Sequence, residues 1–212
     1  ASENAVLTCR VIDRPMRPLF PKDYRNDVTL ENLVMAVDQD CSPELTAMLG
    51  AALATSISDI PFDGPISTTQ VGLVDGEFVF NPTAAQKIVS DLALTVASTK
   101  EKVIMIEAGA KEVPEDKMIE AIFAAHELNQ KVIAFFDTIV AECGKKKHEY
   151  QSFAVPQELF DAIQEIVTPA EMEEAVFTDD KQTREENIRV ITEKLEEAFA
   201  DNEEWLAKLG EA

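Results

Sequence analysis

The chain has 212 residues, of which 46% are hydrophobic and 28% are charged, a composition typical of a folded protein. Its 40 acidic residues outnumber the 19 basic ones and give a formal net charge of −21, which argues against polyanion binding through overall charge. No run of 18 apolar residues occurs, so no membrane span is predicted.

The first elements alternate between helical and extended patterns. Apolar residues at helical spacing predict a helix over residues 3–13, and Pro15 should kink or end it because proline lacks a backbone N–H. Alternating apolar residues predict a strand from Asp27 to Asp38. The order Ser42-Pro43-Glu44 is that of a helix start, with a capping side chain, a proline and an acidic first turn.

The middle of the chain is predicted to form a sheet. Residues 71–74 and 78–80 are apolar runs on either side of Asp75-Gly76, a pair typical of a tight hairpin turn. Two further strands are predicted, from Asp91 to Ala97 and from Val103 to Ile106.

Helices dominate the rest of the chain. Apolar residues recur at helical spacing from Pro114 to Cys143, and the basic run Lys145–Lys147 that follows is interpreted as a solvated linker in preference to an RNA contact. Residues 151–212 carry 17 acidic and 5 basic residues in helical patterns. The sequence therefore predicts an α+β domain over residues 1–146 and a small all-α domain over residues 147–212.

The cysteines and histidines bear on compartment and metal binding. Cys9, Cys41 and Cys143 are far apart and odd in number, which fits a reducing, cytoplasmic location without disulfides. Neither His126 nor His148 has a metal-ligand neighbour four residues away, so no zinc site is expected. The chain begins with alanine, and we expect it to be a processed product or a fragment.

Basic residues gather near the start of this acidic chain. Residues 1–25 hold five basic and three acidic residues. Arg10, Arg14 and Arg17 would share one face if the helix continued past Pro15. Guanidinium groups suit phosphate oxygens in geometry and in charge. The alternative is that these arginines pair with the chain's surplus carboxylates.

The same segment carries a resemblance to a known family. Residues 10–21, RVIDRPMRPLFP, closely resemble part of the first core domain of the bacterial polynucleotide phosphorylases (polyribonucleotide nucleotidyltransferases). IPFDGPI at residues 60–66 and FNPT at residues 80–83 continue the resemblance, which extends over essentially the whole chain. In that family, two ribonuclease-PH-type core domains are joined by an all-helical domain and followed by RNA-binding modules, and three subunits form a ring.

The resemblance implies what this chain contains. Residues 1–146 would be the later part of the first ribonuclease-PH-like core domain, and residues 147–212 most of the all-helical linker domain. The strands that should precede Ala1 and the second core domain would be absent, so exposed strand edges are expected. The implied activity is 3′→5′ phosphorolysis of RNA to nucleoside diphosphates, and the reverse polymerisation. RNA and inorganic phosphate would be its partners in a cytoplasmic homotrimer, without DNA or membrane contacts.

The resemblance also implies that this copy of the core has lost its chemistry. The family's catalytic copy binds phosphate at a serine-rich helix start and holds Mg²⁺ or Mn²⁺ with two aspartates six residues apart. Here the corresponding residues are Ser42-Pro43-Glu44 and a single aspartate, Asp91, with Ala85 six residues earlier. Pro43 offers no N–H, and Glu44 places negative charge where an anion would bind. We therefore expect no catalytic and no metal-binding residue in this chain, the metal belonging to the absent second core domain.

Two functions remain as expectations. In the first, the segment supports the ring and guides RNA through Arg10, Arg14 and Arg17 in an enzyme of RNA processing and mRNA degradation. In the second, the chain is an acidic α+β interaction module without RNA chemistry. An open groove shared by Arg14 and Arg17 would favour the first, and burial of both against carboxylates would favour the second.

Overall fold

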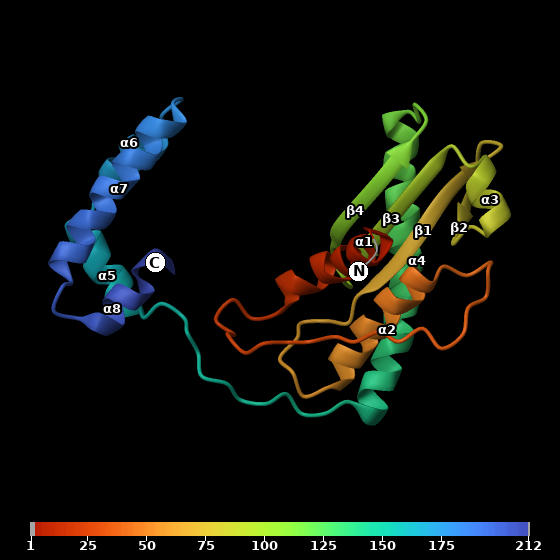
Figure 1. Ribbon diagram of the computed structural model, residues 1–212, viewed down its shortest axis with the longest axis horizontal. Coiled ribbons are helices and arrows are strands. Elements are labelled where there is room, and N and C mark those ends of the chain that lie inside the picture. Colours follow the sequence, from red (N-terminus) through yellow and green to blue (C-terminus); the bar gives the residue numbers. More distant parts are fainter. Residues whose placement is uncertain (1–2, 212) are drawn as a thin grey trace. The chain divides into compact units, whose positions relative to one another are not determined.

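The computed structural model describes residues 3–211, which divide into two compact units with the boundary in the chain between Gln151 and Ser152 (Figure 1). The first unit mixes strands and helices, and the second is entirely helical. This confirms the predicted α+β class with an all-α part after it, whereas the boundary predicted between residues 146 and 147 stays a prediction. No helix among the described residues is long and apolar enough to span a bilayer.

The first unit is built from one sheet and four helices. Its elements in chain order are α1 (Glu3–Met16), a 3₁₀ turn (Arg17–Leu19), α2 (Pro43–Ile57), β1 (Ser67–Val74), β2 (Glu77–Phe80), α3 (Ala84–Val89), β3 (Leu92–Ser98), β4 (Val103–Ala110) and α4 (Glu115–Cys143). The strands pair antiparallel in the order β2-β1-β3-β4. The predicted hairpin is confirmed, and Asp75 and Gly76 have the positive φ angles, 51° and 82°, of its tight turn.

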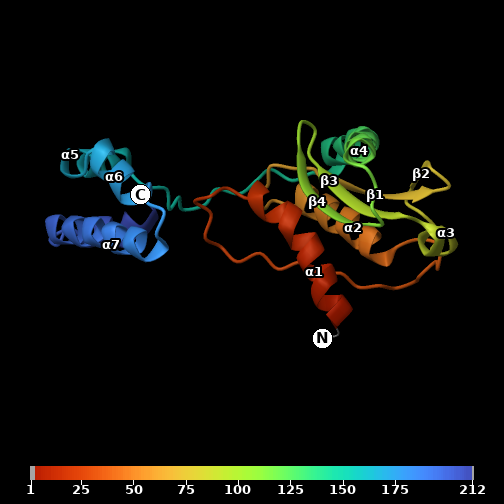
Figure 2. The same cartoon turned by 90° about the horizontal axis from the view of Figure 1, so that it is seen from above.

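Helices cover both faces of this sheet (Figures 1 and 2). On one face α4 packs Ala121 and Ala125 against Leu94 and Val96 of β3. On the other face, α1 and α2 pack against the sheet around Ala97 and Met105, and the shared core residues include Ile12, Met16, Met48, Ala51 and Phe62. Alternate residues of β3 therefore serve two different cores, as the two-residue period of a strand requires.

A buried amide fixes α4 on the sheet. Asn129 of α4 is fully buried, and its Nδ2 donates to the carbonyl of Val96 and to the hydroxyl of Ser98, each at 3.0 Å. The hydroxyl of Thr69 on β1 donates to Asn129 Oδ1 at 2.8 Å. This network satisfies polar groups that would otherwise be unpaired in the core.

The strand predicted from Asp27 to Asp38 is wrong. The segment is irregular, and no described strand pairs with it. Its apolar side chains are exposed, with Leu33 at 81% and Met35 at 90% of their accessible surface. An extended segment becomes a strand only when a neighbour receives its backbone hydrogen bonds, and nothing within the described residues does so.

Pro15 acts at the end of its helix. α1 continues for one residue past Pro15 to Met16 and then tightens into the 3₁₀ turn that begins at Arg17. Pro15 itself is fully buried. The predicted effect of this proline is thus confirmed, and the arginine that follows it lies on the turn rather than on the α-helix.

The second unit is a small helical bundle. Its helices are α5 (Gln157–Ile166), α6 (Pro169–Val176), α7 (Lys181–Ala198) and α8 (Glu203–Lys208), followed by a 3₁₀ turn (Leu209–Glu211). Leu159, Leu195 and Phe199 form its core, and Trp205 packs edge-on against Phe199 with the ring centres 5.1 Å apart. Thr168 and Asp180 cap the starts of α6 and α7 with their side chains, which sets where these helices begin.

Candidate functional site

The start of α2 is occupied by a carboxylate of the chain itself. Ser42 caps the helix, its hydroxyl accepting from the N–H of Leu45 at 3.3 Å, and it donates to Glu44 Oε2 at 2.7 Å. The hydrogen bond from Ser42, followed by one from the backbone, lowers the pKa of Glu44 below its ordinary value. A helix N-terminus attracts anions. Here the carboxylate of Glu44 provides the negative charge at this end of α2, and Pro43 has no N–H to donate.

The carboxylate of Asp91 forms an ion pair with a lysine instead of standing open to a metal ion. Lys111 Nζ lies 3.4 Å from Asp91 Oδ1 and also donates to the carbonyl of Ser90 at 3.2 Å. Ala85, on α3, contributes no ligand atom. Across residues 3–211, no three His, Cys, Asp or Glu side chains gather closely enough to hold a metal ion. The residues of this region therefore do not fit a divalent cation.

The three arginines at the start of the chain differ in their contacts. Arg17 forms an ion pair with Asp13, with Nη2 and Oδ2 separated by 2.6 Å, and both side chains remain exposed. Arg10 and Arg14 are also exposed and make no hydrogen bond or ion pair within the described part of the chain. All three therefore lie at the surface, and Arg10 and Arg14 have no side-chain partner among the described residues.

The open groove anticipated for these arginines holds only one of them. Arg17 lines a groove of about 870 Å³ between α1 and the segment after it, together with Phe20, Lys22 and Tyr24. Arg14 does not line this groove. The structure thus matches neither expected outcome fully, because Arg14 and Arg17 are not brought into one groove and neither is buried against a carboxylate. The assignment of Arg10, Arg14 and Arg17 to RNA stays a prediction.

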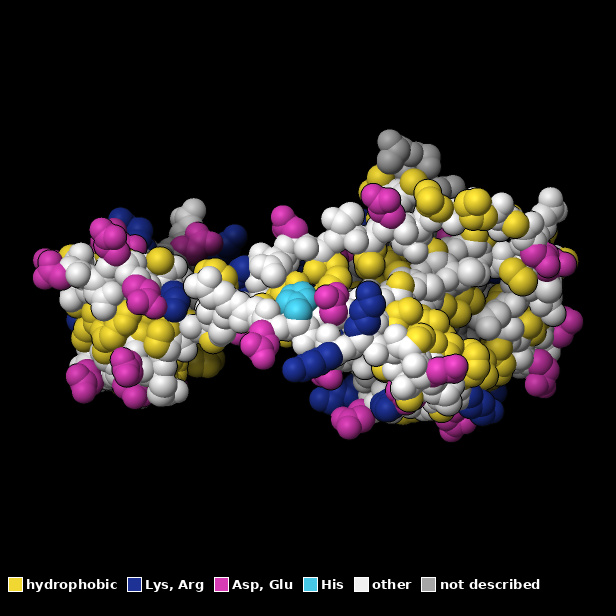
Figure 3. Space-filling view, turned by 90° about the horizontal axis from the view of Figure 1, so that it is seen from below, with side chains coloured by type: hydrophobic (Ala, Val, Ile, Leu, Met, Phe, Trp, Pro, Cys, Tyr) yellow, Lys and Arg dark blue, Asp and Glu magenta, His cyan; other side chains and the backbone are white. Residues whose placement is uncertain are grey.

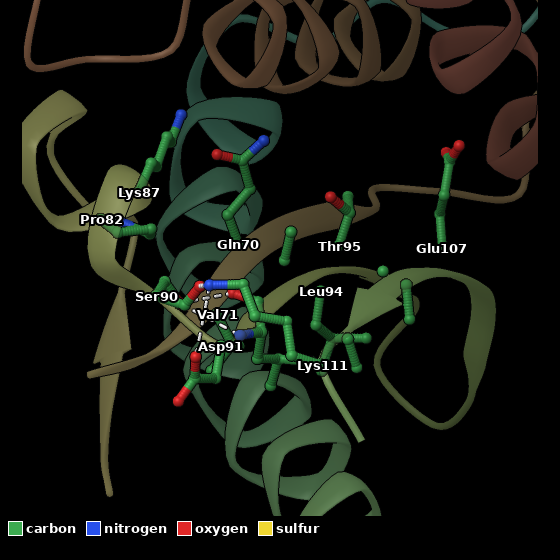
Figure 4. A pocket seen from close by; sticks show the side chains of 15 residues that line it. Gln70, Val71, Pro82, Lys87, Ser90, Asp91, Leu94, Thr95, Glu107 and Lys111 are labelled. Atoms are coloured by element: carbon green, nitrogen blue, oxygen red, sulfur yellow. Dashed lines mark hydrogen bonds and ion pairs between the residues drawn. The ribbon is translucent and has the colours of Figure 1, made fainter. Parts of the chain in front are cut away.

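A second hollow lies over the sheet, on the face that α1 and α2 cover only partly. Its volume is about 590 Å³, and its lining residues include Gln70 of β1, Thr95 of β3, Glu107 of β4 and Lys87 of α3. Figure 4 shows these four side chains projecting to the same side of the sheet. These residues were not predicted, because β1 carries four polar residues in a row and nothing along the chain singles out Gln70. Only strand pairing shows that Gln70, Thr95 and Glu107 lie together.

Lys147 was misread as part of a solvated linker. Its Nζ donates to the carbonyls of Thr55, Ser56 and Ser58 at the end of α2, at 3.2, 2.9 and 2.8 Å. Burial lowers the pKa of Lys147, and the nearby charge of Asp59 offsets part of that effect. A lysine at a helix C-terminus satisfies carbonyls that have no partner within the helix, so this residue anchors the segment after α4.

Two tyrosines extend the anchoring of this segment. Tyr150 donates to Asp23 Oδ1 at 2.9 Å, and its ring meets that of Tyr24 edge-on at 5.0 Å. The hydroxyl of Tyr24 lies 3.3 Å from His148 Nε2. These contacts join residues 148–150 to the loop that follows the arginines.

Charge is distributed unevenly over the surface. Figure 3 shows acidic side chains scattered over both units and basic ones gathered mainly on the first unit. Apolar side chains are also exposed over part of the first unit in this view. Basic side chains are thus present at the surface of a chain whose net charge is −21.

Comparisons with known proteins bear on the family of this chain. Residues 64–127 match the model of the 3′ exoribonuclease family, domain 2. The polyribonucleotide nucleotidyltransferase of Lachnoclostridium phytofermentans is 76% identical over this whole chain, which covers 30% of that relative. The one from Ruminiclostridium cellulolyticum is 51% identical over 94% of the chain, which covers 28% of it.

The chain thus spans about 30% of the length of these relatives. A solved archaeal exosome core aligns with 64% of this chain and 64% of its own at 18% identity and a TM-score of 0.49, a likeness too slight to decide the fold. The two relatives carry the family name to which the sequence resemblance pointed. The chain therefore belongs, as a segment of a longer protein, to the polyribonucleotide nucleotidyltransferase family.

Proposed function

We propose that this chain is a non-catalytic, RNA-guiding segment of a phosphorolytic 3′→5′ exoribonuclease. The complete protein would degrade RNA with inorganic phosphate, release nucleoside diphosphates and catalyse the reverse polymerisation. It would act as a cytoplasmic homotrimer in RNA processing and mRNA degradation. The names of the two relatives and the 3′ exoribonuclease domain over residues 64–127 support this proposal.

The observation that carries the non-catalytic role is the start of α2. Glu44, held by Ser42 at 2.7 Å, stands where inorganic phosphate would need helix N–H groups. The carboxylate of Asp91 pairs with Lys111, and among residues 3–211 no three His, Cys, Asp or Glu side chains gather to hold a metal ion. The Mg²⁺ or Mn²⁺ of the complete enzyme would accordingly be held by its second core domain, where it would neutralise developing charge on the phosphate.

The exposed arginines support a role in guiding RNA. Arg10 and Arg14 have no protein partner among the described residues, so their guanidinium groups are available to phosphate oxygens. Arg17 uses part of its hydrogen-bonding capacity in the ion pair with Asp13, although both side chains remain exposed to solvent. We rank Arg14 and Arg10 as the stronger phosphate contacts and Arg17 as the more constrained one.

The first experiment tests whether this chain is catalytic by itself. The 212-residue chain and the full-length parent are each incubated with RNA, inorganic phosphate and Mg²⁺, and nucleoside diphosphate release is measured. Release is expected from the parent alone. Diphosphates released by the 212-residue chain would show that this copy of the core is catalytic.

The second experiment tests the arginines in the full-length parent. Arg14→Glu should weaken RNA binding and reduce the slope of log K against log salt by about one. Arg189→Glu is the matched control because Arg189, on α7, pairs with Glu186 and Glu193 at the surface of the other unit. If both variants leave the slope at the wild-type value, Arg14 does not contact RNA.

One observation favours the alternative of an interaction module. The Arg17–Asp13 pair is the kind of internal ion pair that this alternative predicts. An exposed pair of this type contributes little to stability. The pair therefore distinguishes the two functions only when Asp13 is altered.

A further inference from the structure

β4 forms one edge of the sheet. The strand order is β2-β1-β3-β4, so β4 pairs with β3 on one side and with no described strand on the other (Figure 1). The N–H of Lys111, the residue after β4, donates to the carbonyl of Asp91 at 3.0 Å, so the odd-numbered residues of β4 direct their backbone groups toward β3. The N–H and carbonyl groups of Ile106, Ala108 and Ala110 therefore point outward, and they make no hydrogen bond within the described part of the chain.

This edge lacks the features that usually protect a sheet edge. Natural edge strands carry lysine, proline or a bulge, each of which hinders pairing with another chain. β4 reads VIMIEAGA, without proline or lysine, and the irregularity in its register lies near its start, opposite Ala97 and Ser98. Residues 106–112 are exposed without interruption. The second half of β4 is therefore a regular and accessible strand edge.

The part of α4 beside this edge is apolar and exposed. Ile119 and Phe123 lie one helical turn apart, with 52% and 61% of their surfaces accessible. The same flank of α4 carries Gln130, about three turns further along, and its Nε2 donates at 3.0 Å to the carbonyl of Thr99 in the turn between β3 and β4. This flank of α4 therefore faces the β4 side of the sheet.

β4 adds an exposed apolar residue on the same side. Ile106 is opposite Val96, and Val96 packs against α4, so the side chain of Ile106 points to the α4 side of the sheet. α4 packs on β1 and β3, and Ile106 is left 46% exposed. We call Ile106, Ile119 and Phe123 the apolar ledge. Because the ledge borders a free strand edge, a strand added there would place every second side chain against apolar surface.

Four carboxylates flank the edge and the ledge. Glu115 and Glu127 extend the ledge along α4, each four residues from its nearest apolar member, and Glu107 and Glu112 lie within β4 and just after it. None of the four makes a side-chain hydrogen bond or ion pair among the described residues. The lysine that follows β4, Lys111, is already ion-paired. The edge is thus complementary in charge to a basic partner.

We propose that the edge of β4 binds an extended basic segment of a partner protein as an added strand. The outward backbone groups of Ile106, Ala108 and Ala110 would exchange hydrogen bonds with it, and alternate apolar side chains of the partner would cover the apolar ledge. Lysine or arginine residues between them would meet the four carboxylates. This inference does not rest on the proposed function, because it needs no phosphorolysis and no contact with RNA.

A second copy of this chain fits the edge less well. Twofold pairing of β4 with itself would set the same surface of two copies face to face, including all four carboxylates. Like charges placed opposite one another on paired strands are destabilising. A basic segment replaces this repulsion with attraction, so the charge of the edge assigns it to a different protein.

The direct test uses a fluorescent peptide of eight residues, the length of β4, in which valine alternates with lysine. Anisotropy titrations should show saturable binding to the full-length parent and to the 212-residue chain. The same peptide with all backbone amides methylated keeps its charge but cannot donate strand hydrogen bonds, and it should bind about tenfold more weakly. Equal binding of the two peptides would overturn the proposal. Binding to the 212-residue chain alone would overturn it too, because the parent would then cover the edge itself.

Two pairs of variants of the full-length parent locate the site. Ala108→Pro removes an outward N–H that β3 does not use, and edge strands accept proline, so peptide affinity should fall about tenfold with little change in melting temperature. Ala108→Val keeps the N–H and is its control. Phe123→Ser should lower peptide affinity about fivefold. Phe135→Ser is its control, because Phe135 is similarly exposed, at 62%, on another flank of α4.

Three results would overturn the proposal. The first is that the wild-type parent shows no saturable peptide binding, and the second is that a folded Ala108→Pro variant binds the peptide as Ala108→Val does. The third is equal binding by Phe123→Ser and Phe135→Ser, a comparison that decides the matter even where the proline variant fails to fold. Self-association of the parent that is lost in Ala108→Pro, without peptide binding, would assign the edge to a second copy instead.

Discussion

The hydroxyl of Ser42 donates to the carboxylate of Glu44 at 2.7 Å while it also caps α2 through the N–H of Leu45. One serine thereby fixes the first turn and holds a negative charge against the positive end of the helix. The start of α2 therefore carries its own negative charge, held in place by the residue that caps the helix.

Glu44→Gln should destabilise the folded chain by about 0.5–1 kcal/mol at pH 7, the usual contribution of a carboxylate at a helix N-terminus. Because the pKa of Glu44 is lowered in the folded chain, its stabilisation is present above the pKa of the unfolded chain and is lost as the pH falls through the folded value. Urea unfolding at several pH values should therefore show the two proteins converging below about pH 4. A constant difference down to pH 3 would contradict this account, and Glu31→Gln, in the exposed irregular segment, is the control.

Asp13→Asn in the full-length parent should release Arg17, because the 2.6 Å ion pair between them is lost. If Arg17 serves RNA, the affinity for single-stranded RNA should rise and the salt dependence should steepen by about one released counterion. Fluorescence anisotropy across a salt series measures both quantities. An unchanged slope would favour the interaction module, and Asp161→Asn in α5 provides a charge-matched control.

Lys147→Met should lower the free energy of unfolding by about 1–2 kcal/mol, since three carbonyls at the end of α2 lose their donor. Lys146→Met is an exact sequence neighbour with an exposed side chain and should change stability by less than about 0.5 kcal/mol. Chemical denaturation of both variants gives the comparison. Equal stabilities would mean that the contacts of Lys147 contribute nothing net.

Asn129→Ala should be among the most damaging single changes in the first unit, costing about 2–4 kcal/mol. The variant leaves the carbonyl of Val96 and the hydroxyls of Ser98 and Thr69 without partners in the core. A thermal melt combined with the double variant Asn129→Ala/Thr69→Val tests this explanation. If the network is the cause, the two substitutions together should cost less than the sum of the single ones.

Local patterns sufficed for most of the secondary structure. The hairpin at Asp75-Gly76 and the cap at Ser42 depend on turn and capping chemistry within a few residues, and the structure confirms both. The 29-residue helix α4 and the helices of the second unit follow from periodicity along one segment. The negative charge at the start of α2 was likewise predictable, because Glu44 follows the capping residue Ser42 in the sequence.

The sequence by itself therefore determined the features that depend on residues close together along the chain, and it also carried the family resemblance of residues 10–21. Tertiary structure decided the rest. The segment from Asp27 to Asp38 has the composition of a strand but pairs with no strand that the structure describes, and Lys147 meets carbonyls about 90 residues away. Gln70, Thr95 and Glu107 form a row only because antiparallel pairing sets them opposite one another. Such contacts depend on which strands and helices meet, and residue order specifies that only through the packing of the whole domain.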